Sequence, residues 1–335
     1  MHQPEVARLT ALVLAVVVFA PVARAGHSIV LAGAFLVEYL THGKAAMLSA
    51  LTDPPRRRPL AVPGTQADLY VHLGLVAGRP LVLVHGFAPD GKDDLRVRDA
   101  AELLARTGFD VAVPTIPGLT HGRLGPEDVE PVIGALAATG NGKTVLVGVS
   151  VGAEPALLAA ADPRARPRVS AVLSLGGYAS AREVLRFWLT GAYAYQDVRG
   201  RVDHDPEVVR AFVRANADRL DPESRKILEA ADREAAGRLL DAPPPDLQRY
   251  LDALSPLGAL SAIEARLFLV HGRADHAVPY TESLRLAGAR PDRTSLVLVG
   301  LVEHVEGTGG RGWQELRDLL ALWRVMYALL GVSRG

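Results

Sequence analysis

The sequence contains no cysteine. Disulfide bonds, cysteine-ligated metals and thiol catalysis are therefore excluded, and thiol usage gives no information on the redox compartment. The ten histidines are scattered without the spacing of a metal-binding motif. We therefore expect no metal and no cofactor.

Net charge is also lacking, because 37 lysines and arginines are balanced by 37 aspartates and glutamates. A chain with no excess of basic residues has no field to attract a polyanion, so nucleic acid is not expected as a main partner. Aromatic residues make up only 5% of the chain, so any local cluster of them is informative. A length of 335 residues allows one large α/β domain or two ordinary ones.

The N-terminal region contains two apolar runs. Residues 9–20 are apolar apart from Thr10, and residues 29–40 contain only one charged residue, Glu38. Neither run reaches the roughly 20 residues that a membrane-spanning helix needs. Between them, Ala23-Arg24-Ala25 has the small-x-small form of a signal-peptidase site.

These features leave three interpretations open. Residues 9–40 can form a kinked anchor or hairpin in a membrane, residues 1–25 can be a cleaved export signal, or residues 29–40 can be an amphipathic helix that packs on the folded domain. We favour membrane association or export, with the side of the membrane undetermined. Residues 1–58 are thus assigned to a hydrophobic segment followed by a stiff linker, Asp53 to Pro59.

Beyond the linker, short apolar runs alternate with helical patterns. The strands are predicted at residues 81–84, 109–113, 144–149, 169–175 and 267–270. Regular alternation of this kind is typical of an α/β fold with a mostly parallel sheet and helices on both faces. Ligands of such sheets bind at the carboxyl ends of the strands.

The alternation is interrupted after the strand predicted at residues 169–175. Residues 178–262 show successive helical patterns and no strand, which predicts an all-helical insertion, here called the lid. The α/β core is then formed by residues 59–177 and 263–335. The leucine-rich helix predicted at residues 314–330 carries three charged residues, so we expect it to pack on the core.

One stretch has the pattern of a catalytic turn. Gly148-Val149-Ser150-Val151-Gly152 follows an apolar strand and precedes an alanine-rich helix, as in a G-x-S-x-G nucleophile elbow. Glycines two residues before and after the serine allow the strand and the helix to approach closely. The pentapeptide alone also fits an ordinary strand-to-helix turn. Whether it is a nucleophile elbow depends on an acid and a histidine that follow it in the expected order.

Those partners are present in the order serine, acid, histidine. Asp275 follows the strand at 267–270, and His304 follows the next strand. The segment that follows the strand at 169–175, residues 175–178, is uncharged and offers no acid. An acyl-transfer site requires these three groups together with hydrogen-bond donors for the oxyanion.

With these motifs, the chain from about residue 67 onward resembles an α/β-hydrolase-fold enzyme. The motifs are LVLVHGF at 81–87, GVSVG at 148–152, HGRADHAVP at 271–279 and EHV at 303–305. The resemblance implies that Ser150 is the nucleophile, His304 the general base and acid, and Asp275 its orienting carboxylate. It also implies oxyanion donors at the backbone N–H groups of Phe87 and Val151.

The expected function is therefore a serine hydrolase that cleaves a carboxylic ester or a thioester of a small molecule. An acyltransferase or peptidase with the same triad, and a noncatalytic membrane-associated binding module on this fold, are the alternatives. In the lid, the aromatic residues Phe187, Trp188 and Tyr193 are candidates to line an acyl pocket, with lid packing as their other interpretation.

Overall fold

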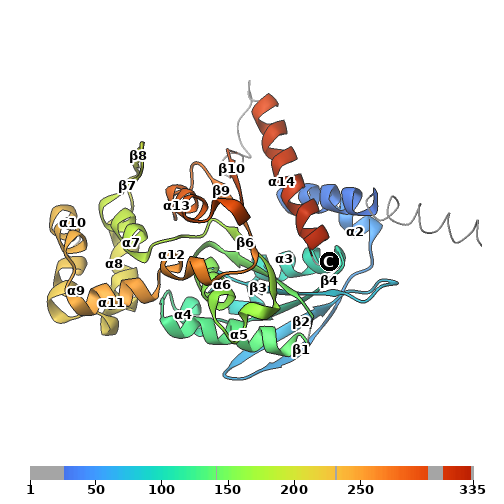
Figure 1. Ribbon diagram of the computed structural model, residues 1–335, viewed down its shortest axis with the longest axis horizontal. Coiled ribbons are helices and arrows are strands. Elements are labelled where there is room, and N and C mark those ends of the chain that lie inside the picture. Colours follow the sequence, from blue (N-terminus) through green and yellow to red (C-terminus); the bar gives the residue numbers. More distant parts are fainter. Residues whose placement is uncertain (1–25, 141, 231, 301–311, 333–335) are drawn as a thin grey trace, which may run out of the picture.

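The computed structural model describes residues 26–140, 142–230, 232–300 and 312–332. Its centre is an eight-stranded sheet of order β1-β2-β4-β3-β5-β6-β9-β10 (Figure 1). The strands β1 and β2 run antiparallel to their neighbours, and the pairs from β4 to β10 are parallel. The strands are β1 Arg56–Val62, β2 Thr65–Val71, β3 Arg79–Val84, β4 Phe109–Pro114, β5 Thr144–Val149, β6 Val169–Leu175, β9 Arg266–Gly272 and β10 Thr294–Val299. The predicted fold class is confirmed.

Each parallel strand contributes alternate side chains to two separate cores, because successive residues of a strand point to opposite faces. In β3, Val82 and Val84 belong to the core under α5 and α6, whereas Leu81 and Leu83 belong to the core under α3 and α14. The core helices are α2 Met47–Leu51, α3 Leu95–Arg106, α4 Pro117–Thr120, α5 Val129–Ala138, α6 Ala153–Ala161, α13 Thr281–Ala289 and α14 Gly312–Val332.

The helix of residues 26–40 is part of this folded body. Its residues Leu31, Ala32 and Ala34 are buried in the same core as Leu329 of α14, and the indole N–H of Trp323 donates to the carbonyl of Ile29 at 3.1 Å. Within the ranges described, no helix is both long and apolar enough to cross a bilayer. Of the three interpretations of this region, the structure bears out packing on the domain for residues 29–40, while residues 9–20 and 23–25 lie outside the described residues.

The predicted linker is also part of the sheet. Residues 56–59, expected to form a stiff connection, begin β1, and Pro59 is paired with Asp68 of β2. Strand β1 is an edge strand, where the missing N–H of a proline need not break a ladder. The side chain of Arg57 binds Asp68 on the neighbouring strand, which is a cross-strand pair that a solvated linker would lack.

The lid emerges after β6, as predicted, but it is not all-helical. Ala192–Tyr195 (β7) and Val198–Arg201 (β8) form an antiparallel hairpin in a stretch that was expected to contain no strand. The first lid helix ends at Thr190 because Gly191 adopts a left-handed conformation, with φ +76°. The lid helices are α7 Ala181–Thr190, α8 Pro206–Ala215, α9 Pro222–Glu229, α10 Arg233–Asp241, α11 Pro245–Ala253 and α12 Pro256–Ala259.

The lid is held on the core by specific polar contacts. Asn216, at the end of α8, accepts a hydrogen bond from the N–H of Leu124 at 3.0 Å and donates to the carbonyl of Gly122 at 3.1 Å. The hydroxyl of Tyr250 in α11 donates to the carbonyl of Leu124 at 2.6 Å. The lid and α14 lie at opposite ends of the molecule, with the sheet between them (Figure 1).

Candidate active site

Ser150 occupies a strained turn at the carboxyl end of β5. Its φ is +52°, in the left-handed region that side-chain-bearing residues rarely adopt, and it opens a single 3₁₀ turn, Ser150–Gly152, that leads into α6. Holding a non-glycine residue in this conformation costs on the order of 1–3 kcal/mol. The predicted elbow is therefore present, and Ser150 is only partly exposed above the sheet edge.

The two glycines of the motif are required by close backbone approach. A Cβ atom at Gly152 would lie 2.1 Å from the carbonyl oxygen of His85, and one at Gly148 would lie 2.5 Å from the Cα of Ala153. Both distances are below any tolerated contact, and the obstructing atoms are backbone. Strand β3, strand β5 and the start of α6 therefore meet around Ser150 only because these positions lack side chains.

Both predicted oxyanion donors adjoin the serine. Val151 follows Ser150 directly, with its side chain buried. Phe87 follows Gly86, where a Cβ atom would lie 3.1 Å from the Cβ of Ser150, so the segment after β3 passes beside the nucleophile. The Phe87 ring is partly exposed and contacts Phe212 of the lid, with ring centroids 6.2 Å apart.

Asp275 lies at the same edge of the sheet, in the loop after β9. Its Oδ1 accepts hydrogen bonds from the N–H groups of Ala277 and Val278, at 2.8 and 3.0 Å. Its Oδ2 lies 3.2 Å from the Cβ position of Gly176, which follows the neighbouring strand β6. Burial raises the pKa of Asp275, but hydrogen bonds from His271 and the two amides outweigh it, so that the pKa is lowered overall and the carboxylate is ionised at neutral pH.

The third predicted residue, His304, lies outside the described residues. The structure therefore brings together Ser150, Asp275 and the two oxyanion segments at one sheet edge, and the position of the base stays a prediction. The described chain resumes at residue 312 with α14.

Comparison with known families agrees with this arrangement. The family model described as the alpha/beta hydrolase fold matches residues 79–304, which is more than half of the chain and contains Ser150, Asp275 and the lid. The chain belongs to the α/β-hydrolase fold family. No curated protein sequence matches it.

Solved structures of other α/β hydrolases share the fold at low identity. The acylaminoacyl peptidase of Pyrococcus horikoshii matches with a TM-score of 0.53 and 13% identity over 85% of this chain and 42% of that chain. A 2,6-dihydroxy-pseudo-oxynicotine hydrolase matches with a TM-score of 0.52 and 19% identity over 86% of this chain and 73% of that chain. This α/β hydrolase therefore spans about two fifths of the length of the peptidase, and at these identities the likeness concerns the fold alone.

Two other histidines of this α/β hydrolase have structural roles, as their strand-end positions suggest. His85 accepts a hydrogen bond from the N–H of Ile116 at Nε2 and contacts the carbonyl of Gly86 through Nδ1, which requires the neutral tautomer protonated at Nδ1. Burial lowers the pKa of His85, in keeping with that neutral form. His271 donates from Nε2 to the carbonyl of Val278 and pairs its Nδ1 with the hydroxyl of Ser283.

Of the three aromatic residues of the lid that were candidates to line a pocket, only Trp188 lines a cavity. A cavity of about 30 Å³ lies between lid and core and is lined by Trp188 and Phe212 of the lid. Phe187 is fully buried on another side of α7, against His204 and Tyr193, with ring centroids 4.5 and 5.8 Å apart. Phe187 does not line the cavity, because Phe187 and Trp188 are adjacent residues of α7 and project in different directions. Tyr193, in β7, does not line it either.

The cavity is connected to the proposed catalytic loops by one chain of aromatic contacts. The Trp188 ring is packed edge-on against Phe212, with centroids 4.6 Å apart, and Phe212 in turn contacts Phe87. The indole N–H of Trp188 donates to the carbonyl of Ala277, beside Asp275, at 2.6 Å. The wall of the cavity thus touches both the oxyanion segment and the acid loop.

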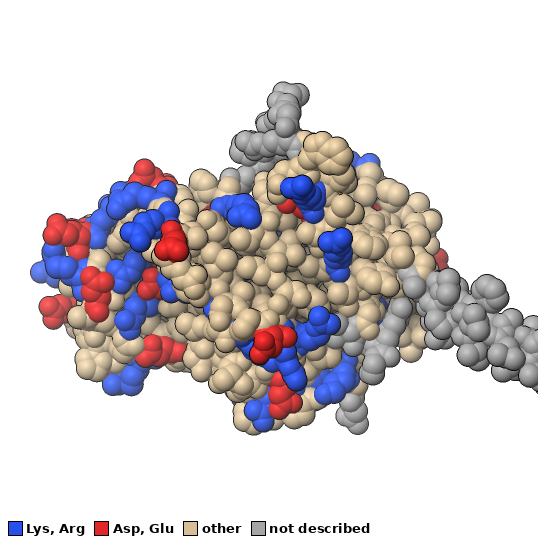
Figure 2. Space-filling view, turned by 45° about the horizontal axis from the view of Figure 1, so that its top comes forward, with Lys and Arg blue, Asp and Glu red and all other residues tan. Residues whose placement is uncertain are grey.

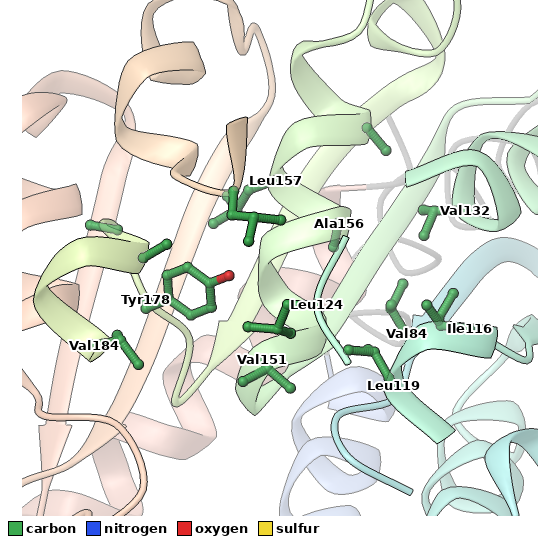
Figure 3. Close-up of a cluster of buried hydrophobic side chains, with 14 of the residues drawn as sticks. Val84, Ile116, Leu119, Leu124, Val132, Val151, Ala156, Leu157, Tyr178 and Val184 are labelled. Carbon is green, nitrogen blue, oxygen red and sulfur yellow. The ribbon is translucent and has the colours of Figure 1, made fainter. Parts of the chain in front are cut away.

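Sequence reasoning missed a pair of buried polar groups next to the elbow. Glu154, in the first turn of α6, is buried, and its Oε2 has no hydrogen-bond partner. Burial, with the nearby Asp128 and Glu127, raises the pKa of Glu154 well above its usual range, which favours its protonated form. Figure 3 shows the hydroxyl of the equally buried Tyr178 directed toward α6 near Leu157. In the sequence, a single glutamate within an alanine-rich segment was the signal that could have indicated this buried carboxyl group.

The described residues contain no group of three or more histidine, aspartate or glutamate side chains placed to hold a metal ion. The carboxylates of the site are instead bound by protein N–H groups, as at Asp275.

Proposed function

We propose that this α/β hydrolase is a serine esterase that cleaves carboxylic esters or thioesters of small apolar acyl groups through an acyl-enzyme on Ser150. The observation that carries the proposal is the positive φ of Ser150 at the junction of β5 and α6. Close backbone contacts require the two glycines, and the turn they allow holds Ser150 in a strained conformation. Such strain is expected where the serine hydroxyl takes part in a reaction.

In the proposed first step, the Oγ of Ser150 attacks the ester carbonyl while His304 takes the hydroxyl proton. The carbonyl oxygen becomes an oxyanion and accepts hydrogen bonds from the N–H groups of Phe87 and Val151. The tetrahedral intermediate then expels the alcohol or thiol, which receives the proton from His304. The ionised Asp275 orients the histidine and stabilises its positive charge.

In the second step, a water molecule attacks the acyl-enzyme and gives its proton to His304. Collapse of the second tetrahedral intermediate releases the carboxylic acid and returns the proton to Ser150, so that the enzyme is regenerated. The apolar lining of the cavity between lid and core, with Trp188 and Phe212 at its wall, supports an apolar acyl group.

The first test is labelling of the full-length chain with a fluorophosphonate, compared with the Ser150→Ala variant. The full chain is needed because residues 26–58 belong to the folded body. We expect labelling at Ser150 and hydrolysis of p-nitrophenyl esters, with turnover reduced on the order of 10⁴-fold or more in the variant. A series of acyl lengths then measures the size of the pocket.

A folded wild-type protein that neither reacts with the probe nor hydrolyses any ester would exclude the esterase and favour the noncatalytic binding module. Addition of an alcohol or amine to the assay separates hydrolysis from acyl transfer. If the acyl group is captured by the added nucleophile faster than by water, the enzyme is an acyltransferase with the same residues.

A further inference from the structure

Three helical segments at the end opposite the lid expose an unusual number of large apolar side chains. They are the helix of residues 26–40, α2 and α14, and we call their outer surface the apolar face. Its exposed members are Ile29, Val30, Val37, Met47, Leu51, Trp313, Leu316, Leu319 and Leu320. Trp313 is 80% exposed. Soluble monomers rarely expose clusters of this kind without a binding partner.

The exposed residues of α14 follow helical spacing. Trp313, Leu316 and Leu320 are separated by three and four residues, so they project from one side of the helix. The other side of α14 carries Val325 and Leu329 into the core under the sheet. The helix is therefore apolar on two sides, only one of which the protein itself covers.

The apolar face is built on a well-packed support. Trp323 of α14 binds the carbonyl of Ile29, and its ring lies 3.9 Å from the Cβ position of Gly33. Leu31 and Leu48, on the inner sides of the two other segments, are buried in the same core. The outward side chains are thus presented on helices whose inner sides are fixed.

Most of the acidic side chains of these segments are buried, whereas the basic ones are exposed. Glu38 and Asp318 are buried. The N–H of Ser49 donates a hydrogen bond to Glu38 at 2.8 Å, and the N–H of Gly300 donates one to Asp318 at 2.7 Å. The outward charges on residues 26–51 and 312–331 are the cations Lys44, Arg317 and Arg324 and one acid, Glu315. Figure 2 shows far fewer charged side chains here than over the lid.

The sequence just before the helix of residues 26–40 favours a lipid bilayer as the occupant of the apolar face. Residues 9–20 form the longest apolar run of the N-terminal region, and only residues 21–25 separate it from the helix that exposes Ile29 and Val30. Five residues span at most about 18 Å when fully extended. If this run enters a bilayer, the apolar face is held within that distance of the membrane surface.

We propose that the apolar face rests on a lipid bilayer containing anionic lipids. Helices that lie in the interfacial plane of a membrane typically combine leucine and tryptophan with lysine and arginine, as the apolar face does. The exposed cations would favour anionic headgroups by about 1 kcal/mol each. The lid, at the other end of the molecule, then points away from the membrane (Figure 1). This proposal does not depend on the catalytic one.

The test measures partition of the full chain onto vesicles of phosphatidylcholine mixed with phosphatidylglycerol. It uses two backgrounds, the native sequence and a chain whose N-terminal run is interrupted by Leu14→Asp with Val17→Asp. In the interrupted background, Leu316→Glu with Leu320→Glu is expected to lower the partition coefficient roughly tenfold or more, because two apolar contacts become charged. Arg317→Gln with Arg324→Gln is expected to lower it about fivefold per charge removed.

The matched control is Leu95→Glu with Val208→Glu, which introduces the same charges at exposed apolar positions outside the apolar face. It should leave partition unchanged. Unfolding midpoints verify that each variant is folded, and Trp313→Ala provides a milder second variant of the apolar face.

Two results would overturn the proposal. An interrupted chain that is folded but does not bind anionic vesicles would show that the apolar face has no affinity for lipid. A change from dimer to monomer in the Leu316→Glu and Leu320→Glu variant, with vesicle binding unaltered, would assign the apolar face to a second copy of the chain.

Discussion

The lid and the helices at the opposite end are attached to the same sheet by different interactions. The surface of the lid carries exposed ion pairs, such as Arg210 with Glu207 and Arg238 with Glu234. The lid meets the core through apolar packing in the core under α5 and α6 and through hydrogen bonds such as those at Leu124 and Ala277. The opposite end is joined by continuous apolar packing and buries its acids. Polar contacts can be exchanged for contacts with water at small net cost, whereas buried apolar area cannot.

This difference indicates how each region can move. Opening of the lid would break the hydrogen bonds at Leu124 and Ala277, and it would also expose apolar side chains of the lid that are buried with the core, such as Leu251. The N- and C-terminal helices cannot separate without opening the core. The variants below test this contrast in order of decreasing effect.

The largest effect is expected from a truncation in the core under α14. Leu329→Ala removes a fully buried side chain and should lower the free energy of unfolding by about 2–5 kcal/mol, through lost burial and the cavity left behind. Leu316→Ala, on the exposed side of the same helix, should change it by less than about 0.5 kcal/mol. Denaturant unfolding compares the two, and equal losses would show that the packing of α14 is not the main source of stability at this end.

The next effect depends on pH and has opposite signs at the two ends. Burial raises the pKa of Asp128, next to the lid, to about 6, so the native state binds a proton more tightly than the unfolded chain does. Stability from this group is complete below about pH 4 and is lost as the pH rises through 6, by about 2–3 kcal/mol. Asp128→Asn should therefore make the decline in stability between these pH values smaller. Part of the decline should remain, because burial also raises the pKa of Glu154.

Glu38 provides the counterpart at the opposite end. Burial raises its pKa, but hydrogen bonds from Ser49 outweigh burial and lower it overall, so its contribution is present above its unfolded pKa and is lost as the pH falls. Glu38→Gln should reduce the loss of stability in acid. Thermal unfolding across pH 3 to 8, roughly the range in which these carboxyls titrate, measures both variants. Parallel rather than opposite changes would contradict the assigned pKa directions.

A smaller effect is expected at the lid contact itself. Asn216→Ala leaves the buried N–H of Leu124 without its acceptor and should cost about 1–2 kcal/mol. If the lid opens as a separate unit, local hydrogen exchange in α8 is expected to increase more than global stability falls. Uniform loss of protection across sheet and lid would mean that the lid does not open as a separate unit.

The smallest effect is expected on the lid surface. Arg238→Gln breaks an exposed pair with Glu234 one helical turn away and should change the free energy of unfolding by no more than about 0.5 kcal/mol. A thermal melt at low and high salt measures it. A larger, salt-dependent loss would show that the surface pairs of the lid act as a network.

Much of the core could be predicted from sequence, because its signals are local. The apolar runs of β3 and β5 and the glycines around Ser150 act within a few residues of one another, and the structure contains each of them where expected. Asp275 could be located because it follows a strand that ends at the same edge as β5. The position of His304 stays a prediction, since it lies outside the described residues.

The sequence was least informative where distant contacts decide the structure. The composition of residues 29–40 left packing on the domain as one of three interpretations, and only the contact of this helix with Trp323, almost three hundred residues away, shows that packing. Membrane association stays a proposal. The hairpin of β7 and β8 is short, and its strands contain too few residues for alternation to be distinguished from a helical pattern. The left-handed Gly191 was the local signal that the helix ends.

The backbone of Ser150 has a consequence for attempts to improve this protein by selection. Glycine would adopt a φ of +52° without strain, so a library screened only for heat resistance should enrich Ser150→Gly, with a gain of roughly 1 kcal/mol. Such a screen would discard the proposed nucleophile while it reports an improved protein. Directed evolution of this enzyme therefore has to score turnover in every round.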